Sequence, residues 1–536
     1  MKRKSIQLLA LLCALALLLG LAGCGRSSEI DPNNVIPEST GGKDLVKADA
    51  IDHVFSLNSN SRYSFNPVVA TNHANQLICS LVYENMVEVD NNFEVIPNVI
   101  TDWSCSEDGK SWTFMIDTTR VFHDGSPVTG NDLRWSLANA INADRYKGRY
   151  ASIQGVGYDT DRMTVTLGIP NTQFIKLLNI PVVKTGTFGD DHPIGSGPYM
   201  WNEDGTALLA FTGHNGFDKL PVDTIYIQEY TNAGDILSAF EDSLLDVALN
   251  DPSSYTNLGY ASTNETRSFV TTNMHYIAFN EDSALGRYSN VRTALGYAID
   301  RAYFEELMNG DAVGTPIPMV PDCAYYPTEL ADNHQFDLER CRRILENYGI
   351  QDYDGDGRLE LSNSNNQDVT MTLILSSDSS VKSGVARRFA EDLATVGVTV
   401  NVVELTWDAY LTALEEGKLE EGEFDMYYGE VKLRNDFDLT ELLQVRNKDN
   451  AGTNLNFTHS TDRAFETYIN NYLAASNASR ADQYAQLAQY LIDTGSLLTI
   501  GFEKQQLITH RGVVKGADPN AGNPLYNFVN WEIDLS

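Results

Sequence analysis

The sequence predicts an α/β protein with more than one domain. A chain of 536 residues is longer than one hydrophobic core usually organises. Residues 369–375 alternate apolar and polar as a strand does, and residues 384–396 repeat apolar positions at helical spacing before Gly397. Residues 398–402 alternate again. A strand, a helix and a strand in this order predict a right-handed βαβ crossover, and such parallel strands belong to α/β domains.

Composition limits the function classes. A hydrophobic content of 42% and an aromatic content of 10% suit packed cores and argue against disorder. The formal net charge is -35, so the surface repels phosphate backbones and excludes nucleic acid as a partner. The same charge suits cationic ligands, or serves solubility alone.

The N-terminus has the pattern of an export signal. Residues 2–4 are basic, residues 6–22 are almost wholly apolar, and the run ends in the small-residue sequence L-A-G-C. This resembles a bacterial lipobox, which predicts a lipoprotein signal peptide over 1–23 and lipidation of Cys24. Residues 24–47 are polar, lack periodicity and predict a flexible tether. The prediction is a protein anchored by lipid to the extracytoplasmic face of a bacterial cell membrane; the alternative is an uncleaved membrane helix.

A strand, a turn and a helix follow one another in residues 96–137. Residues 112–116 alternate as a strand, and an Asp-Gly turn follows. Thr129 and Asp132 have the spacing of a box-like helix cap before an apolar repeat. Patterns of the same kind predict a strand pair over 158–169 and single strands over 54–57, 224–229, 246–249, 275–280 and 498–508. They predict helices over 75–89, 289–308, 337–348 and 480–492.

An acidic turn resembles the first half of a calcium loop. Asp352, Asp354 and Asp356 stand at alternate positions, so their carboxylates can converge on one hard cation, and Gly357 permits a sharp turn. The twelfth position of such a loop is a bidentate glutamate, but here it is Asn363. A structural calcium ion and an acidic surface turn without metal both remain open.

No assembled catalytic motif is present in the sequence. The nine histidines are scattered without an H-E-x-x-H pair, and no G-x-G-x-x-G follows a strand. The loop PIGSGPY lacks the spacing of a nucleophile elbow. These observations favour a binding protein over an enzyme. The cysteines after the lipobox form no C-x-x-C pair, and we expect buried free thiols at Cys79, Cys105, Cys323 and Cys341.

Five segments, taken in order, resemble the extracytoplasmic solute-binding proteins of family 5. These are the oligopeptide, dipeptide and nickel receptors of ABC importers. The segments are the run 80–137, the loop PIGSGPY at 193–199, HYIAFN at 275–280, YSNVRTALGYAIDRAYFEELMNG at 288–310 and FDLERCRRILENYGI at 336–350.

The resemblance implies a two-lobe periplasmic-binding-protein-like fold of type II, cluster C, with an extra N-terminal subdomain on lobe I. It implies hinge closure around a ligand held between the lobes. The expected division is lobe I over 48–66, 187–275 and 499–536, the extra subdomain over 67–186, and lobe II over 276–498.

The resemblance also suggests ligand-binding residues. Peptide-binding relatives often carry G-W-x-x-D-x-x-D-P, whose first Asp pairs with the peptide amino terminus; here the region reads YYGEVKLRNDFDLTELL. Asp436 and Asp438 are the candidates for that role, and Arg434 could meet a carboxylate. Trp407, Tyr428 and Asn72 are expected to line the cleft.

The resulting hypothesis is a monomeric receptor that delivers a peptide to an ABC permease, with no cofactor beyond the calcium ion considered above. The alternatives are binding of a nickel chelate or another small solute, or ligand sensing for a signalling partner.

Overall fold

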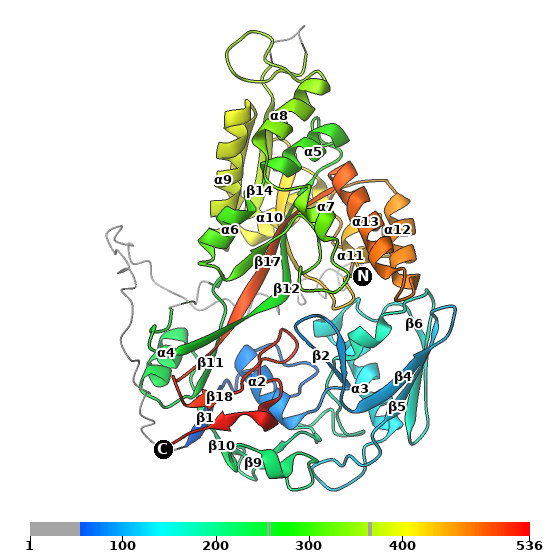
Figure 1. The fold of residues 1–536 in the computed structure, drawn as a ribbon, viewed down its shortest axis with the longest axis vertical. Coiled ribbons are helices and arrows are strands. Elements are labelled where there is room, and N and C mark those ends of the chain that lie inside the picture. The colour runs from blue at the N-terminus through cyan, green and yellow to red at the C-terminus, as the bar shows by residue number, and fades with distance from the viewer. Residues whose placement is uncertain (1–53, 255–256, 258, 363–366) are drawn as a thin grey trace, which may run out of the picture.

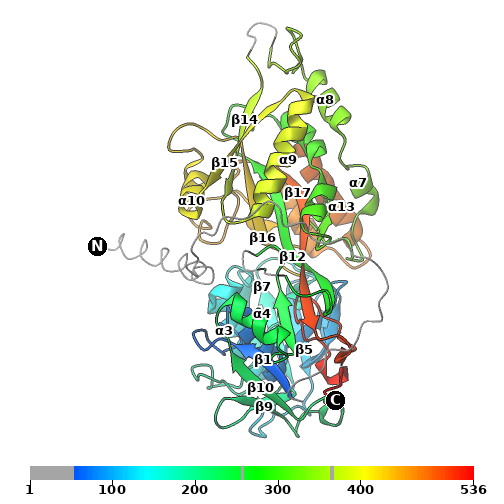
Figure 2. The ribbon, with the colours of Figure 1, turned by 90° about the vertical axis from the view of Figure 1, so that its left-hand side faces the viewer.

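The computed structural model describes residues 54–254, 257, 259–362 and 367–536. The predicted signal peptide, Cys24, the predicted tether, the first residues expected in lobe I and Asn363 lie outside these residues. The chain forms two bodies, one above the other in Figures 1 and 2, joined by long strands that run through both. We call the lower body lobe I and the upper body lobe II. Within the described part of the chain, no helix is long and apolar enough to cross a membrane.

Lobe I contains a four-stranded sheet in the order β1-β10-β9-β8. Its members are β1 (Phe55–Ser59), β10 (Thr224–Glu229), β9 (Ala207–Ala210) and β8 (Tyr199–Trp201). β1 and β10 are parallel although more than 160 residues separate them, so the segment between must leave the sheet and return. α2 (His73–Val82) packs against β1 and β8, and α4 (Ala233–Glu241) follows β10.

The segment between β1 and β8 forms the extra subdomain. Its antiparallel sheet has the order β4-β5-β7-β6, with α3 (Gly130–Asn142) against β6 and β7. Its core is continuous with that of lobe I. The predicted helix cap is confirmed: Thr129 N and Oγ1 donate to Asp132 Oδ2 at 3.0 and 2.6 Å. The strands are β2 (Val87–Val89), β3 (Val95–Pro97), β4 (Ile100–Cys105), β5 (Ser111–Ile116), β6 (Ile153–Tyr158) and β7 (Arg162–Leu167).

A seven-stranded sheet joins the two lobes. Its path is β11-β17-β12-β16-β14-β15, and β13 also pairs with β17. β12 and β17, the crossing strands, extend from lobe I into lobe II (Figure 2), with register shifts in β12 between Val270 and Met274 and between His275 and Tyr276. The sheet consists of β11 (Val247–Asn250), β12 (Glu265–Phe279), β13 (Ala312–Gly314), β14 (Thr370–Ser376), β15 (Thr399–Leu405), β16 (Met426–Lys432) and β17 (Leu497–Thr509).

The predicted βαβ unit is confirmed in lobe II. β14 and β15 pair in parallel and α9 (Ser380–Val396) connects them. Gly397 ends the helix with φ of 97°, a left-handed conformation that suits glycine.

The prediction of a single helix over 289–308 was wrong. The structure has α5 (Ser289–Leu295), the short helix η4 (Gly296–Ala298) and α6 (Arg301–Leu307). The Asp300 side chain accepts from Tyr303 N at 3.1 Å and so caps a new helix in the middle of the apolar repeat. The remaining elements are η1 (Asp144–Tyr146), η2 (Phe174–Leu178), η3 (Phe217–Lys219), α7 (Thr328–Asp332), α8 (Leu338–Asn347), α10 (Trp407–Glu416), α11 (Thr440–Leu443), α12 (Ala464–Ala474), α13 (Arg480–Thr494), β18 (Val514–Lys515), η5 (Phe528–Asn530) and β19 (Glu532–Ile533).

The PIGSGPY loop needs its glycines for a close backbone approach. A Cβ atom on Gly195 would lie 2.1 Å from Val82 O, and one on Gly197 would lie 2.5 Å from Leu81 O. The loop therefore presses against the end of α2. The predicted free thiols are confirmed for the four cysteines of the described chain, although Cys105 is only half-buried.

Candidate functional site

Asp436 lies where lobe II meets the extra subdomain. Its side chain is fully buried, and Oδ2 accepts from Asn171 Nδ2 at 2.9 Å, a contact between segments 265 residues apart. Burial, together with the neighbouring charge of Asp438, raises the pKa of Asp436. The adjacent residue Phe437 has φ of 52°, and its ring packs edge-on against Phe93 with 4.9 Å between centroids. This carboxylate therefore helps to hold the two lobes together in this structure.

Arg434 reaches across the same interface. Its guanidinium forms ion pairs with Asp438 and Glu441, at 3.1 Å for Asp438, and donates to Gly148 O at 3.0 Å. Burial alone would lower the pKa of Arg434, but the two carboxylates outweigh burial and raise it. The structure thus brings together the predicted trio Arg434, Asp436 and Asp438, with Arg434 paired to Asp438 and Asp436 bound to Asn171.

Further polar contacts line this boundary. Tyr325 Oη donates to Gln173 Oε1 at 2.9 Å, and Lys176 Nζ lies 5.0 Å from the centre of the Tyr325 ring. Thr172 N and Oγ1 donate to the carbonyls of Leu473 and Ala475 at 2.8 and 2.6 Å. A cavity beside Phe93 measures only about 10 Å³, room for about one water molecule. The lobes are closely packed here.

The other residues predicted to bind ligand lie apart from this trio. Trp407 begins α10 with 37% of its surface exposed. Tyr428 is 1% exposed and lies within the sheet. Asn72 caps α2 by accepting from Asn75 N at 3.2 Å. Among the described residues, no hydrogen bond or ion pair joins Trp407, Tyr428 or Asn72 to the trio.

A group of basic side chains, which we call the basic cluster, meets between the lobes: Lys432, Arg145, Arg149 and His73. Lys432 ends β16, two residues before Arg434, whose contact with Gly148 O brings this segment beside Arg149. Arg145 donates to Pro67 O at 3.0 Å and to Ala70 O at 3.4 Å, just before His73 begins α2. Sequence reasoning missed this cluster, since its members come from three distant segments.

Lys432 carries its charge close to other cations of the basic cluster. The side chain is exposed, yet burial is the largest cause that lowers its pKa to about 8, followed by the charges of Arg145 and Arg149. His73 is likewise exposed, with a pKa lowered by burial, Lys432 and Arg145. Within the described chain, Lys432 has neither an ion pair nor a side-chain hydrogen bond.

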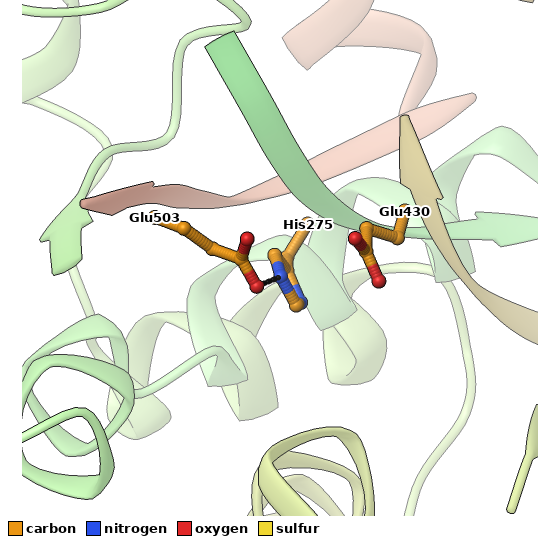
Figure 3. A group of neighbouring side chains, drawn as sticks. All are labelled: His275, Glu430 and Glu503. Atoms are coloured by element: carbon orange, nitrogen blue, oxygen red, sulfur yellow. Dashed lines mark hydrogen bonds and ion pairs between the residues drawn. The ribbon is translucent and has the colours of Figure 1, made fainter. Parts of the chain in front are cut away.

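A buried polar network stabilises the crossing strands (Figure 3). His275 Nε2 lies 2.7 Å from Glu503 Oε1, and His275 Nδ1 lies 2.9 Å from Tyr428 Oη. Asn273 Nδ2 donates to Glu503 at 2.8 Å and to Glu430 at 2.9 Å. Burial opposes ionisation of Glu503, but the hydrogen bonds from His275 and Asn273 lower its pKa. The network ties β12, β16 and β17 together at the position of the register shifts.

Two groups of side chains have the composition of a metal site. His275, Glu430 and Glu503 each offer one ligand atom, and these atoms lie within 4.8 Å of one another. Their acceptors are already used, since Lys382 Nζ lies 2.9 Å from Glu430 and Asn273 bridges the glutamates. The second group is the acidic turn predicted as a calcium loop, to which the structure adds Glu360.

The structure has two α/β bodies that are joined by crossing strands, and polar groups converge between the bodies. This architecture is that of a two-lobe solute-binding protein. The sequence model of the bacterial extracellular solute-binding proteins, family 5, matches residues 94–452, more than half of the chain. The chain belongs to this family. Its members bind small solutes or peptides outside the cytoplasm, work with ABC transporter permeases and are not enzymes.

Similar proteins of known name differ in their ligands. Heme-binding protein A of Haemophilus influenzae is 21% identical, with 91% of this chain and 92% of the relative covered. Glutathione-binding protein GsiB of Salmonella typhimurium is 24% identical, with 69% of this chain and 72% of the relative covered. The structure of the oligopeptide-binding protein AppA of Bacillus subtilis with a nonapeptide superposes with a TM-score of 0.61 at 18% identity, covering 90% and 98% of the two chains. The last similarity confirms the fold.

Proposed function

We propose that this chain is a lipid-anchored receptor that captures a peptide or another small solute bearing a free carboxylate and delivers it to an ABC permease. The carboxylate is recognised by the basic cluster between the lobes. Cys24 provides the membrane anchor, and the solute is enclosed when the lobes close about the crossing strands.

The observation that carries the proposal is the unpaired positive charge of Lys432. The chain as a whole has a net charge of -35, so a local group of cations is unexpected on solubility grounds. Arg145 and Arg149 depress the pKa of Lys432, which means that the three groups repel one another when no anion is bound. A carboxylate between them would relieve that repulsion and accept charge-assisted hydrogen bonds.

The names of similar proteins are consistent with this ligand class. Glutathione and the nonapeptide named for two relatives both carry free carboxylates. In those relatives that use it, the aspartate of the G-W-x-x-D-x-x-D-P motif pairs with a peptide amine. Here Asp436 pairs with Asn171 instead. We therefore assign the main charge recognition to the basic cluster, with Asp436, Asp438 and Arg434 at its border and Trp407, Tyr428 and Asn72 as further predicted contacts.

Isothermal titration of the mature protein with trialanine and with its C-terminal amide tests the ligand class. We expect the free carboxylate to bind at least about tenfold more tightly, since removing one charge partner costs well over 1 kcal/mol. Lys432→Gln should abolish this preference, whereas Lys219→Gln, which changes an exposed lysine in η3, should leave it intact. Equal affinity for acid and amide would contradict carboxylate recognition. An absence of binding by any peptide or by glutarate would contradict the solute assignment.

The anchor is tested separately. Cells expressing the full chain and fed labelled palmitate should place the label on the protein, which should sediment with membranes. Cys24→Ala should remove both properties, whereas Cys105→Ala should keep them. Membrane association that survives loss of Cys24 would reject the lipid anchor.

A further inference from the structure

The acidic turn lies between α8 and β14, at the top of lobe II in Figure 1. In the structure it includes a fourth carboxylate, that of Glu360, beside the three aspartates found in the sequence. Residue Glu360 pairs with Gln351 through backbone hydrogen bonds of 3.2 and 2.9 Å, which closes the loop into a ring. Carboxylate oxygens of Asp352, Asp354, Asp356 and Glu360 then lie within 4.8 Å of one another. Glu360 stands eight residues after Asp352, so it occupies the ninth position of a calcium loop.

The buried side chain of Glu360 can offer one oxygen as a ligand. The residue is 0% exposed, and its Oε2 accepts from Tyr353 N at 2.7 Å. Its Oε1 is buried and has no hydrogen-bond partner among the residues that the structure describes. A buried carboxylate oxygen without a partner is costly, so native proteins rarely leave one. A bound cation would satisfy this oxygen.

The rest of the loop is organised around the same point. Asp352 is held by Gly355 N at 2.7 Å and Gly357 N at 3.0 Å, while both glycines adopt positive φ. Four carboxylates so close together repel one another strongly. Arg358, which lies within the loop, forms an ion pair at 2.7 Å with Asp368 outside the group, and the charge of Asp356 also acts on it. The loop therefore holds four carboxylates against one cation, and that cation's ion pair is with Asp368 outside the group.

We propose that Asp352, Asp354, Asp356 and Glu360 bind one calcium ion. An all-oxygen set of hard ligands on a flexible loop suits Ca²⁺, whereas Mg²⁺ demands near-ideal octahedral geometry and keeps most of its water. Glu360 replaces the glutamate that the sequence lacks at the twelfth position. The ion joins the end of α8 to the start of β14, so its role is to stabilise lobe II, independently of the solute site.

Calcium titration of the mature protein after treatment with a chelator tests the proposal. We expect one site per chain with a Kd of about 10⁻⁴–10⁻³ M, as in extracellular calcium modules, and a higher midpoint of thermal unfolding in calcium than in magnesium. Glu360→Gln and Asp354→Asn should remove the calcium-dependent shift, while Asp218→Asn, at an exposed aspartate of η3, should retain it.

The variants must fold for this comparison, so circular dichroism and the unfolding midpoint in chelator are measured first. Should Glu360→Gln fail to fold, the milder Asp354→Asn change carries the test. A wild-type protein that binds no calcium would overturn the proposal, as would an undiminished shift in both variants. Loss of calcium binding with retained solute binding would support it, because the two sites are separate.

Discussion

Glu88 should make the stability of the protein depend on pH. The side chain is 9% exposed on β2, Oε1 accepts from Asn85 at 3.1 Å, and an interaction with Asn523 also favours the charged form. Burial is the main reason that its pKa rises from 4.5 to about 7. The folded state therefore keeps this proton over a pH range in which the unfolded chain has lost it.

The sign and size of the effect follow from this difference. The stabilising contribution of Glu88 is fully present below about pH 4.5 and is lost as the pH rises through about 7. The difference in pKa corresponds to about 3 kcal/mol in the free energy of unfolding, as an order of magnitude. Glu88→Gln cannot ionise, so it should escape this loss.

Urea unfolding, followed by tryptophan fluorescence between about pH 4.5 and pH 8, measures the effect as a difference between the wild type and Glu88→Gln. The wild type should lose about 3 kcal/mol relative to the variant across that range. Glu203→Gln, at an exposed glutamate, should run parallel to the wild type. If the free energy of unfolding of Glu88→Gln changed with pH in parallel with that of the wild type, the reasoning would be refuted.

Three more predictions follow from the site and its support. Asn171→Ala leaves the buried Asp436 carboxylate without its 2.9 Å donor, so the apparent affinity for solute should fall about tenfold and small-angle scattering should show a more open particle. Gly197→Ala places a Cβ atom 2.5 Å from Leu81 O, so the midpoint of thermal unfolding should fall by several degrees. Because the pKa of Lys432 is about 8, the affinity for a carboxylate should fall about tenfold between pH 7 and pH 9, and Lys432→Gln should abolish this dependence.

Each of these three has its own control. Asn131→Ala changes a half-buried asparagine within the extra subdomain and should not open the particle. Gly155→Ala places its Cβ atom in open space and should leave the midpoint nearly unchanged. An N-acetylated peptide amide has no titratable terminus and should bind equally at both pH values; a similar pH dependence for this ligand would show that Lys432 is not responsible.

Local patterns predicted local structure well. Three correct predictions depend on interactions over only a few residues, so the sequence alone reveals them. They are the alternation of β14 and β15, the glycine after α9 and the cap at Thr129. The break before Asp300 was missed because the apolar repeat continues through it and only the aspartate side chain reveals a second cap. The sequence analysis missed the lobe I half of β12 because apolar and polar residue types do not alternate there.

The site was less accessible to such reasoning. Asp436 and Arg434 could be found from a resemblance, but their pairing with Asn171 and Gly148 depends on tertiary contacts. Lys432 has no distinctive sequence neighbours, and its environment arises from chain segments nearly 300 residues away. Similarly, burial makes Glu360 a candidate cation ligand, and the spacing of the acidic residues does not reveal that burial.

The crossing strands also make lobe II a single insertion that can be exchanged for the same lobe of a relative. β12 enters the lobe and β17 leaves it as neighbours in one antiparallel ladder, so the whole lobe is inserted between two adjacent points of lobe I. An insertion whose ends lie side by side can be exchanged without displacing the host. Grafting lobe II of a relative at this ladder would exchange that lobe while keeping the original N-terminal segment and extra subdomain. A chimera of that kind would separate what selects the solute from what the permease recognises.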